Sequence, residues 1–162
     1  TSLESLDHFI GVNRRNYEAY RSGLADVPGV RMVEYDARHS HNYQYMVLEV
    51  DGDSAGITRD ELVRVLTQER VLARRYFYPG CHRMEPYQSY YPNAWLLLPE
   101  TERLTQRVMS LPTGTAVDED DVATICSIIR LAVNGGSRVR EQLTHSERSP
   151  EDCHSERSAE GA

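Results

Sequence analysis

The stretch RRYFYPGCHRMEPY, residues 74–87, joins a strand pattern to a loop pattern and sets the arrangement of the sequence around it. Residues 71–78 are rich in aromatic and β-favouring side chains and lead into a proline, which is typical of a strand that ends there. Residues 80–99 contain three prolines, and so long a segment without regular structure often carries function. We therefore expect a β-strand over residues 71–78 that runs directly into a long functional loop.

The residues before this stretch indicate one long helix, two strands and a second helix. Apolar side chains recur every three or four positions over residues 3–24, which predicts a helix with one apolar stripe. Residues 30–35 and 42–50 have β-strand character, and the second segment shows clear alternation. Thr58 and Glu61 have the spacing of a capping box, in which each side chain bonds the backbone amide of the other residue, so we expect a helix after Thr58.

The residues after the loop indicate two more helices. We expect a helix over residues 101–109, an extended or turning segment over residues 111–115, and a final helix that Asp118 caps. Asparagine and two glycines at residues 134–136 are a helix stop signal. The whole pattern predicts an α/β small domain, with a short and mostly antiparallel sheet covered by helices and a long helix at the N-terminus.

The composition changes after the second of these glycines. The last part of the chain has no apolar periodicity and contains the segment HSERS twice, at residues 145–149 and 154–158. Such a segment cannot bury enough apolar surface to order itself. We therefore assign residues 1–135 to the domain and expect residues 136–162 to be a disordered, low-complexity tail.

The charge and cysteine content limit the classes of partner. A net charge of −7 disfavours binding to nucleic acids and to anionic membrane surfaces, because both require an excess of cations. No apolar run approaches the roughly 20 residues that span a bilayer. Cys81, Cys126 and Cys153 are widely spaced and odd in number, which favours free thiols in a reducing compartment and predicts a cytoplasmic protein.

A metal site is not expected from the histidines and cysteines. Cys81 and His82 are adjacent, whereas zinc ligands are usually separated by two to four residues. His39 and His41 lie in a separate predicted loop. Cys126 falls on the apolar side of the last helix and is interpreted as a core residue.

Several segments together resemble the C-terminal small domain of nucleotide-sugar aminotransferases of the DegT/StrS class, which depend on pyridoxal phosphate. The resemblance covers about residues 1 to 133 and rests on NRRNY at residues 13–17, NYQY at 42–45, RRYFYPGCH at 74–82, LPETE at 98–102 and LPT at 111–113. It implies the small domain of a fold-type I enzyme. A large domain preceding Thr1 would then hold the phosphate cup, the aspartate that contacts the pyridine nitrogen, and the lysine that forms the Schiff base.

The resemblance also implies a substrate and three candidate contacts. The parent enzyme would aminate a nucleotide-linked keto-deoxy sugar, with glutamate as the usual amino donor. His82, with Tyr78 and Arg75 as its neighbours, would lie on the sugar side of the cleft, where histidine and tyrosine can bond hydroxyl groups and arginine can pair with phosphate. The alternative for His82 is an ordinary surface histidine. Arg74 and Arg75 point to opposite faces of a strand, so at most one of them can face a cleft.

The chain contains no lysine, since all eighteen of its basic residues are arginine. Arginine stays protonated and is a poor nucleophile, so it cannot form the Schiff base. We therefore expect pyridoxal phosphate to act in the full-length parent, with none bound covalently by this chain and no transaminase activity of the chain alone. The alternatives are a non-catalytic interaction module, a degraded gene product, or a fragment that complements a separate large domain; a homodimer stays open.

Overall fold

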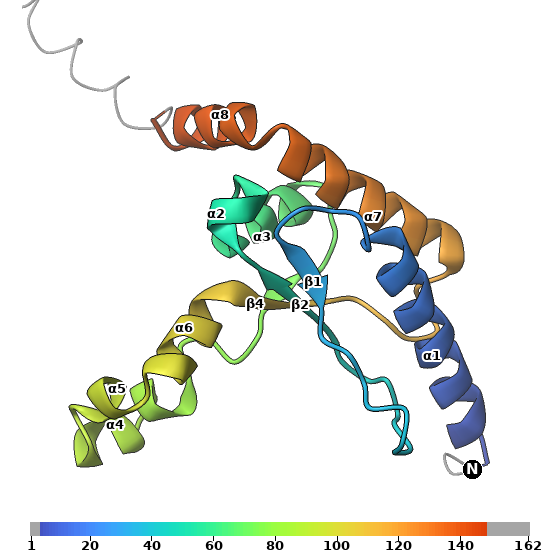
Figure 1. The fold of residues 1–162 in the computed structure, drawn as a ribbon, viewed down its shortest axis with the longest axis horizontal. Coiled ribbons are helices and arrows are strands. Elements are labelled where there is room, and N and C mark those ends of the chain that lie inside the picture. The colour runs from blue at the N-terminus through green and yellow to red at the C-terminus, as the bar shows by residue number, and fades with distance from the viewer. Residues whose placement is uncertain (1–3, 149–162) are drawn as a thin grey trace, which may run out of the picture.

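The computed structural model describes residues 4–148 and contains one antiparallel sheet with helices packed against it (Figure 1). The sheet has four strands in the order β1-β2-β4-β3. Their bounds are Val30–Met32 for β1, Met46–Val50 for β2, Arg74–Arg75 for β3 and Val108–Leu111 for β4. The predicted α/β class with a short, mostly antiparallel sheet is confirmed.

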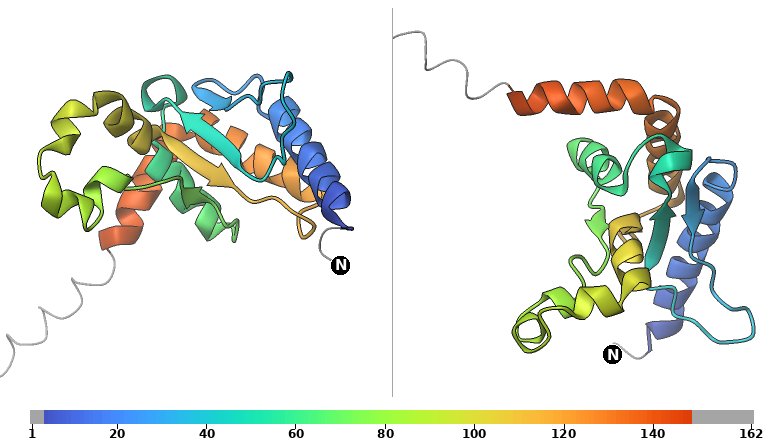
Figure 2. Two further views of the ribbon diagram at one scale, coloured as in Figure 1. Left: turned by 90° about the horizontal axis from the view of Figure 1, so that it is seen from below. Right: turned by 60° about the vertical axis from the view of Figure 1, so that its left-hand side comes forward.

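Three helices cover one face of the sheet, as Figures 1 and 2 show: α1 (Leu6–Gly23), α3 (Arg59–Gln68) and α7 (Glu119–Asn134). Alternate residues of the central strands point towards these helices and are buried, whereas the residues between them are only partly buried. The apolar core therefore lies between this face and the three helices, and its largest members include Tyr20, Met46, Leu48, Leu62, Met109 and Ile129.

The opposite face of the sheet carries less cover. Val47 on β2 and Val108 on β4 point to this side and remain partly exposed. The helix α6 (Pro99–Arg107) lies against one end of this face, where it contacts β2. Beyond α6, the chain extends away from the body as a projection that contains α4 (Tyr87–Tyr90) and α5 (Ala94–Leu97) (Figure 1).

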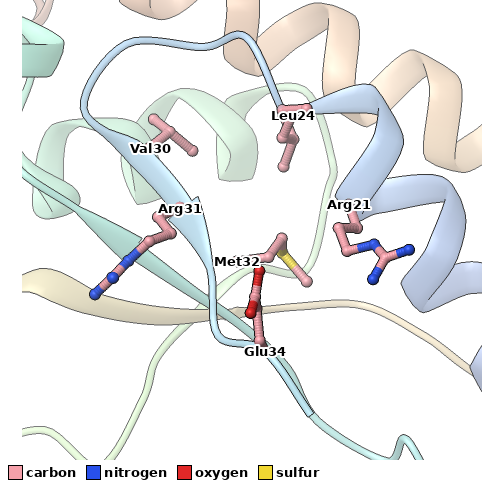
Figure 3. Close-up of a pocket in the computed structure, with 7 residues that line it drawn as sticks. Arg21, Leu24, Val30, Arg31, Met32 and Glu34 are labelled. Carbon is pink, nitrogen blue, oxygen red and sulfur yellow. The ribbon is translucent and has the colours of Figure 1, made fainter. Parts of the chain in front are cut away.

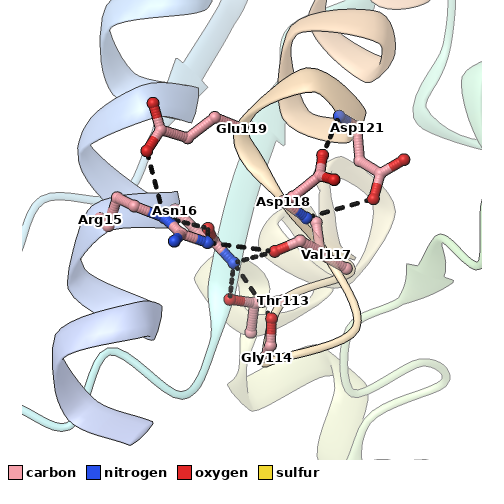
Figure 4. Close-up of polar contacts among 8 residues, drawn as sticks. All are labelled: Arg15, Asn16, Thr113, Gly114, Val117, Asp118, Glu119 and Asp121. Carbon is pink, nitrogen blue, oxygen red and sulfur yellow. Dashed lines mark hydrogen bonds and ion pairs between the residues drawn. The ribbon is translucent and has the colours of Figure 1, made fainter. Parts of the chain in front are cut away.

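Buried polar groups join α1 to the segment that enters α7 (Figure 4). Nδ2 of Asn16 donates hydrogen bonds to Oγ1 of Thr113 at 3.3 Å and to the carbonyl oxygen of Val117 at 3.2 Å. The hydroxyl of Tyr20 donates to the carbonyl oxygen of Pro112 at 3.0 Å. Because buried polar groups are costly without partners, these bonds fix the position of the connecting segment against α1.

Both predicted helix caps are confirmed. The Thr58 hydroxyl accepts from the Glu61 amide at 3.2 Å, and Glu61 accepts from the Thr58 amide at 2.8 Å. Asp118 and Asp121 form the same reciprocal pair at the start of α7 (Figure 4). These bonds satisfy backbone amides that the first turn of a helix leaves without partners.

The strands are shorter than the sequence predicts. β1 ends at Met32 rather than at residue 35, β2 begins at Met46 rather than at residue 42, and β3 covers two residues of the predicted 71–78. Tyr43 has a φ of 50° and Phe77 a φ of 51°, and this left-handed conformation interrupts extended backbone. Local conformation therefore overrides the β-propensity of these aromatic segments.

Two predictions about helices and loops were also incomplete. The helix expected at residues 101–109 is α6, which ends at Arg107, and the following residues form the central strand β4. The segment 80–99 contains the 3-10 helix η1 (Cys81–Arg83), α4 and α5 instead of irregular loop alone. A further short helix, α2 (Gly52–Ala55), follows β2.

The prediction of disorder after residue 135 was wrong for its first part. Residues 136–148 form α8 (Gly136–Arg148). Nε of Arg140 lies 3.0 Å from Oε1 of Glu61, and Leu143 is buried, so this helix packs onto the domain. Residues 149–162 of the predicted tail lie outside the described residues. No helix within residues 4–148 is long and apolar enough to cross a membrane.

Replacing Thr58 with alanine will destabilise the domain. The change removes the hydroxyl that accepts from the Glu61 amide, and loss of such a cap costs about 1 kcal/mol. The measurement is the free energy of unfolding from urea titrations. Thr67→Ala is the matched control, because Thr67 is exposed on the same helix and its hydroxyl bonds only the preceding turn. Equal losses in both variants would contradict the role of the cap.

Candidate functional site

A carboxylate on α6 holds the segment that follows β3. Glu102 accepts a hydrogen bond from Nε2 of His82 on Oε1. Arg83 donates to both oxygens of the same carboxylate, from Nε to Oε1 at 2.7 Å and from Nη2 to Oε2 at 2.7 Å. The Arg83 guanidinium, followed by His82, lowers the pKa of Glu102 to about 2. The carboxylate therefore stays ionised and pins η1 to α6.

His82 is enclosed by this arrangement. Its side chain is 8% exposed. Gly80 packs directly against the imidazole ring, because a Cβ added at that position would lie 2.7 Å from Cε1 of His82. Gly80 also has a φ of 99°, which side chains rarely adopt. Glycine at this position therefore allows the chain to turn tightly around the ring.

Tyr78 lies beside two arginines. The guanidinium carbon of Arg75 is 5.1 Å from the centre of the Tyr78 ring, and that of Arg59 is 5.5 Å from it. Oδ1 of Asp60 lies 2.7 Å from Nε of Arg59 and 3.3 Å from Nε of Arg75. The shared carboxylate balances part of the positive charge, so the two arginines can lie close to one aromatic ring.

Arg59 is the residue of this cluster that the sequence interpretation missed. Its side chain is 0% exposed, and Nη1 donates to the carbonyl oxygen of Val108 at 2.6 Å. Nη2 is buried and lacks a hydrogen-bond partner among the described residues. Only the adjacent capping pattern was visible in the sequence. Glu102 was missed in the same way, because its partners are 19 and 20 positions away.

A large apolar hollow lies next to these residues. It has a volume of about 600 Å³ and is bounded by the open face of the sheet, by α6 and by the segment after β3. Val47, Val108, Phe77, Leu104 and His82 are among its lining residues. A wall of this kind favours apolar groups over phosphate.

A second hollow of about 230 Å³ lies between α1 and β1 (Figure 3). Its lining combines apolar Leu24 and Met32 with charged Arg21, Arg31 and Glu34. Arg31 is paired with Glu49 at 2.6 Å. The charges at this hollow are therefore mixed, and it shares no lining residue with the hollow described above.

The three residues predicted as substrate contacts have different surroundings. Tyr78 and Arg75 lie together at the surface, and both are partly open to solvent. Nε2 of His82 points to Glu102 instead. The predicted contact role of all three stays a prediction. Arg74 and Arg75 are both exposed in β3.

Acid will remove the contribution of Glu102 to stability. Its folded-state pKa of about 2 lies below the ordinary value of 4.5, so its bonds stabilise the fold above about pH 4.5 and are lost as the pH falls towards 2. We expect Glu102→Gln to lower the urea midpoint at pH 7, and we expect the difference from the unchanged chain to shrink as the pH falls from about 4.5 towards 2. In the control Glu100→Gln, the changed residue is exposed and pairs with Arg103 on the same helix. The same pH dependence of the difference in both variants would contradict the assignment.

Comparison with known proteins identifies relatives of this chain. The E. coli dTDP-4-amino-4,6-dideoxy-D-glucose transaminase is 27% identical over 130 residues, which is 78% of this chain and 35% of the relative. A structure of DesI in the presence of its TDP-sugar product is 44% identical with a TM-score of 0.81, and the match covers 89% of this chain and 36% of DesI. The pyridoxal-phosphate form of the sugar aminotransferase Spr1654 from Streptococcus pneumoniae has a TM-score of 0.72 at 12% identity, covering 83% of this chain and 33% of that protein, and shows the fold alone.

The chain spans about a third of the length of these relatives. The family match runs from residue 1 to residue 130. It therefore includes the sheet, the contacts of Glu102 with the segment after β3, and Tyr78 with the arginines beside it. The resemblance inferred from the sequence is confirmed. The chain belongs to the DegT/DnrJ/EryC1/StrS aminotransferase family.

Proposed function

We propose that this chain is the sugar-side part of a pyridoxal-phosphate aminotransferase that aminates a nucleotide-linked keto-deoxy sugar, with glutamate as amino donor. The observation that carries the proposal is the match to DesI, a structure solved with a TDP-sugar product, over 89% of this chain. The proposed parent enzyme includes a large domain, which corresponds to the remaining two thirds of the relatives' length.

The residues of this chain do not fit covalent attachment of pyridoxal phosphate. The coenzyme is bound in such enzymes through a lysine amine, and the chain has no lysine. We propose that the coenzyme belongs to the large domain and that this chain alone has no transaminase activity. What this chain supplies is orientation of the sugar and the electrostatic environment on that side of the cleft.

Tyr78 and Arg75 are the proposed substrate contacts. The hydroxyl of an exposed tyrosine can bond a sugar hydroxyl, and the Arg75 guanidinium can pair with a diphosphate. Arg75 shares Asp60 with Arg59, so it keeps donors free for an anion while its position is fixed. His82 can contact substrate only through its other ring nitrogen, since Nε2 faces Glu102. Its proposed role is therefore to shape the loop and to reach the sugar from Nδ1.

The alternatives keep the same fold but remove the reaction. A non-catalytic interaction module or a degraded gene product would retain the core and the contacts of Glu102 with His82 and Arg83. It would have no selection for Tyr78 and Arg75. A fragment that complements a separate large domain would retain the core, the Glu102 contacts and the two candidate substrate contacts. Cys81 and Cys126 are free thiols, which supports the proposed cytoplasmic location.

Mixing the chain with pyridoxal phosphate will produce no stable internal aldimine. The only primary amine available is at the N-terminus, because lysine is absent. Borohydride reduction followed by peptide mapping is the measurement. We expect no reduced adduct on any side chain, with DesI as the positive control. An adduct on a side chain of this polypeptide would contradict the proposal that the coenzyme belongs to the large domain.

The substrate contacts can be tested in a chimera in which the full chain replaces the 36% of DesI that it matches. We expect Arg75→Gln to raise the KM for the TDP-sugar about tenfold or more, because a charged hydrogen bond contributes roughly 1.5–3 kcal/mol. Arg74→Gln is the control, since the neighbouring side chain is also exposed in the same strand. Equal KM values in both variants would contradict the role of Arg75.

A further inference from the structure

Arg59 is the buried arginine at the start of α3, and its guanidinium joins three parts of the chain. Nε donates to Oδ1 of Asp60 on the same helix at 2.7 Å, and Nη1 donates to the carbonyl oxygen of Val108 on β4 at 2.6 Å. The guanidinium carbon lies 5.5 Å from the centre of the Tyr78 ring. One side chain thus connects the helix, a strand of the sheet and the segment that carries the candidate substrate contacts.

Arg59 is poorly suited to a purely stabilising role. Its side chain is 0% exposed, and Nη2 has no hydrogen-bond partner among the described residues. A buried charged donor without a partner is costly, and a well-packed apolar side chain of similar size often stabilises a fold as well as a buried ion pair does. Packing at this position therefore does not by itself require arginine.

The two oxygens that Arg59 bonds do not depend on it. The Val108 carbonyl also accepts from the amide of Tyr76 at 3.3 Å. The side chain of Asp60 is 43% exposed to water, and its Oδ1 also lies 3.3 Å from Nε of Arg75. Both oxygens would keep a partner without the Arg59 guanidinium, so its removal leaves no buried acceptor unsatisfied.

Tyr78 is the neighbour of Arg59 that the sheet does not hold. The ladder of β3 ends at Arg75, and Phe77 has a φ of 51°, so Tyr78 lies beyond the regular hydrogen bonds of the sheet. The guanidinium groups of Arg59 and Arg75 both lie near its ring and attract the π electrons. Arg59 is the buried one of the two, and an interaction that is shielded from water is stronger.

We propose that Arg59 is a positioning residue, which holds the Tyr78 ring in place for a hydroxyl group of the nucleotide-linked sugar and does not touch the substrate itself. The inference rests on the proposed function, which assigns the sugar contact to Tyr78. A positioning role requires that replacing Arg59 weakens binding of the sugar through Tyr78 alone and leaves the stability of the chain unchanged.

The test compares the unchanged DesI chimera with Arg59→Met, Tyr78→Phe and the double variant. Methionine is unbranched and apolar, so it can fill the buried position without a charge. We expect each single change to raise the KM for the TDP-sugar about three- to tenfold, with a smaller change in kcat, because one neutral hydrogen bond contributes that much. The double variant is expected to match Tyr78→Phe, since two residues that act through one contact are not additive.

Arg64→Met is the matched control, because Arg64 is exposed on the same helix. We expect this control to leave KM unchanged. Additive changes of KM in the double variant overturn the proposal, because Arg59 then acts without Tyr78, and so does an unchanged KM in Arg59→Met. A urea midpoint of the free chain that falls further in Arg59→Met than in Arg64→Met, or a failure of Arg59→Met to fold, overturns it as well, because the arginine is then a structural residue.

A measurement on the free chain separates this inference from the proposed function. The tyrosines are replaced by fluorotyrosine, and the fluorine resonance of Tyr78 is the one that Tyr78→Phe lacks. We expect Arg59→Met, but not Arg64→Met, to move this resonance towards its position in the urea-unfolded chain. A moved resonance with a chimera that does not aminate the TDP-sugar supports the positioning and counts against the function. An unmoved resonance with an active chimera supports the function and overturns the positioning.

Discussion

The sheet is covered by helices on one face and only at one end of the other, and this constraint positions the hollow beside the candidate site. Alternation along β2 sends Met46, Leu48 and Val50 into the core and leaves Val47 to the other side. The other side of β2 carries Val47 and Glu49, which is the alternation of a sheet with one face on the core and one face only partly covered. The helices α1, α3 and α7 supply one cover, and α6 reaches only one end of the second face. The open hollow is a direct consequence of that difference.

Residues 76–83, which follow β3, are held by contacts within the chain although only η1 among them is regular structure. Three separate features act on them: the carboxylate of Glu102, the close packing of Gly80 on His82, and the stacking of Arg59 and Arg75 near Tyr78. Each of them uses a charge or a ring that is at least partly shielded from water, where electrostatic interactions are stronger. The loop that carries the candidate contacts is therefore ordered by interactions within the chain itself.

The sequence predicted features that depend on neighbouring positions and missed those that depend on distant ones. The caps at Thr58 and Asp118 were visible because both partners lie within four residues. The left-handed conformations of Tyr43 and Phe77 were not visible, because both residue types favour strands. The sequence prediction assigned the residues of β4 partly to a helix and partly to a turn, because a strand of four residues before a proline shows little periodicity. The apolar content of 84–98 was read as loop because its prolines dominated the pattern.

The same distinction applies to the candidate site. Tyr78, His82 and Arg75 could be selected from one short stretch, but their geometry depends on Asp60, Glu102 and the buried Arg59. A buried arginine needs partners for its donors, and Asp60 and the Val108 carbonyl bond Nε and Nη1 of Arg59, while Nη2 has no partner among the described residues.

Because Arg59 lies in the interior of this domain, the position of Tyr78 is set before any other domain is in contact. In the function proposed above, the part of the site that contacts the sugar is therefore preorganised within this chain. In the function proposed above, the coenzyme chemistry comes from a lysine of the proposed large domain, because this chain has none.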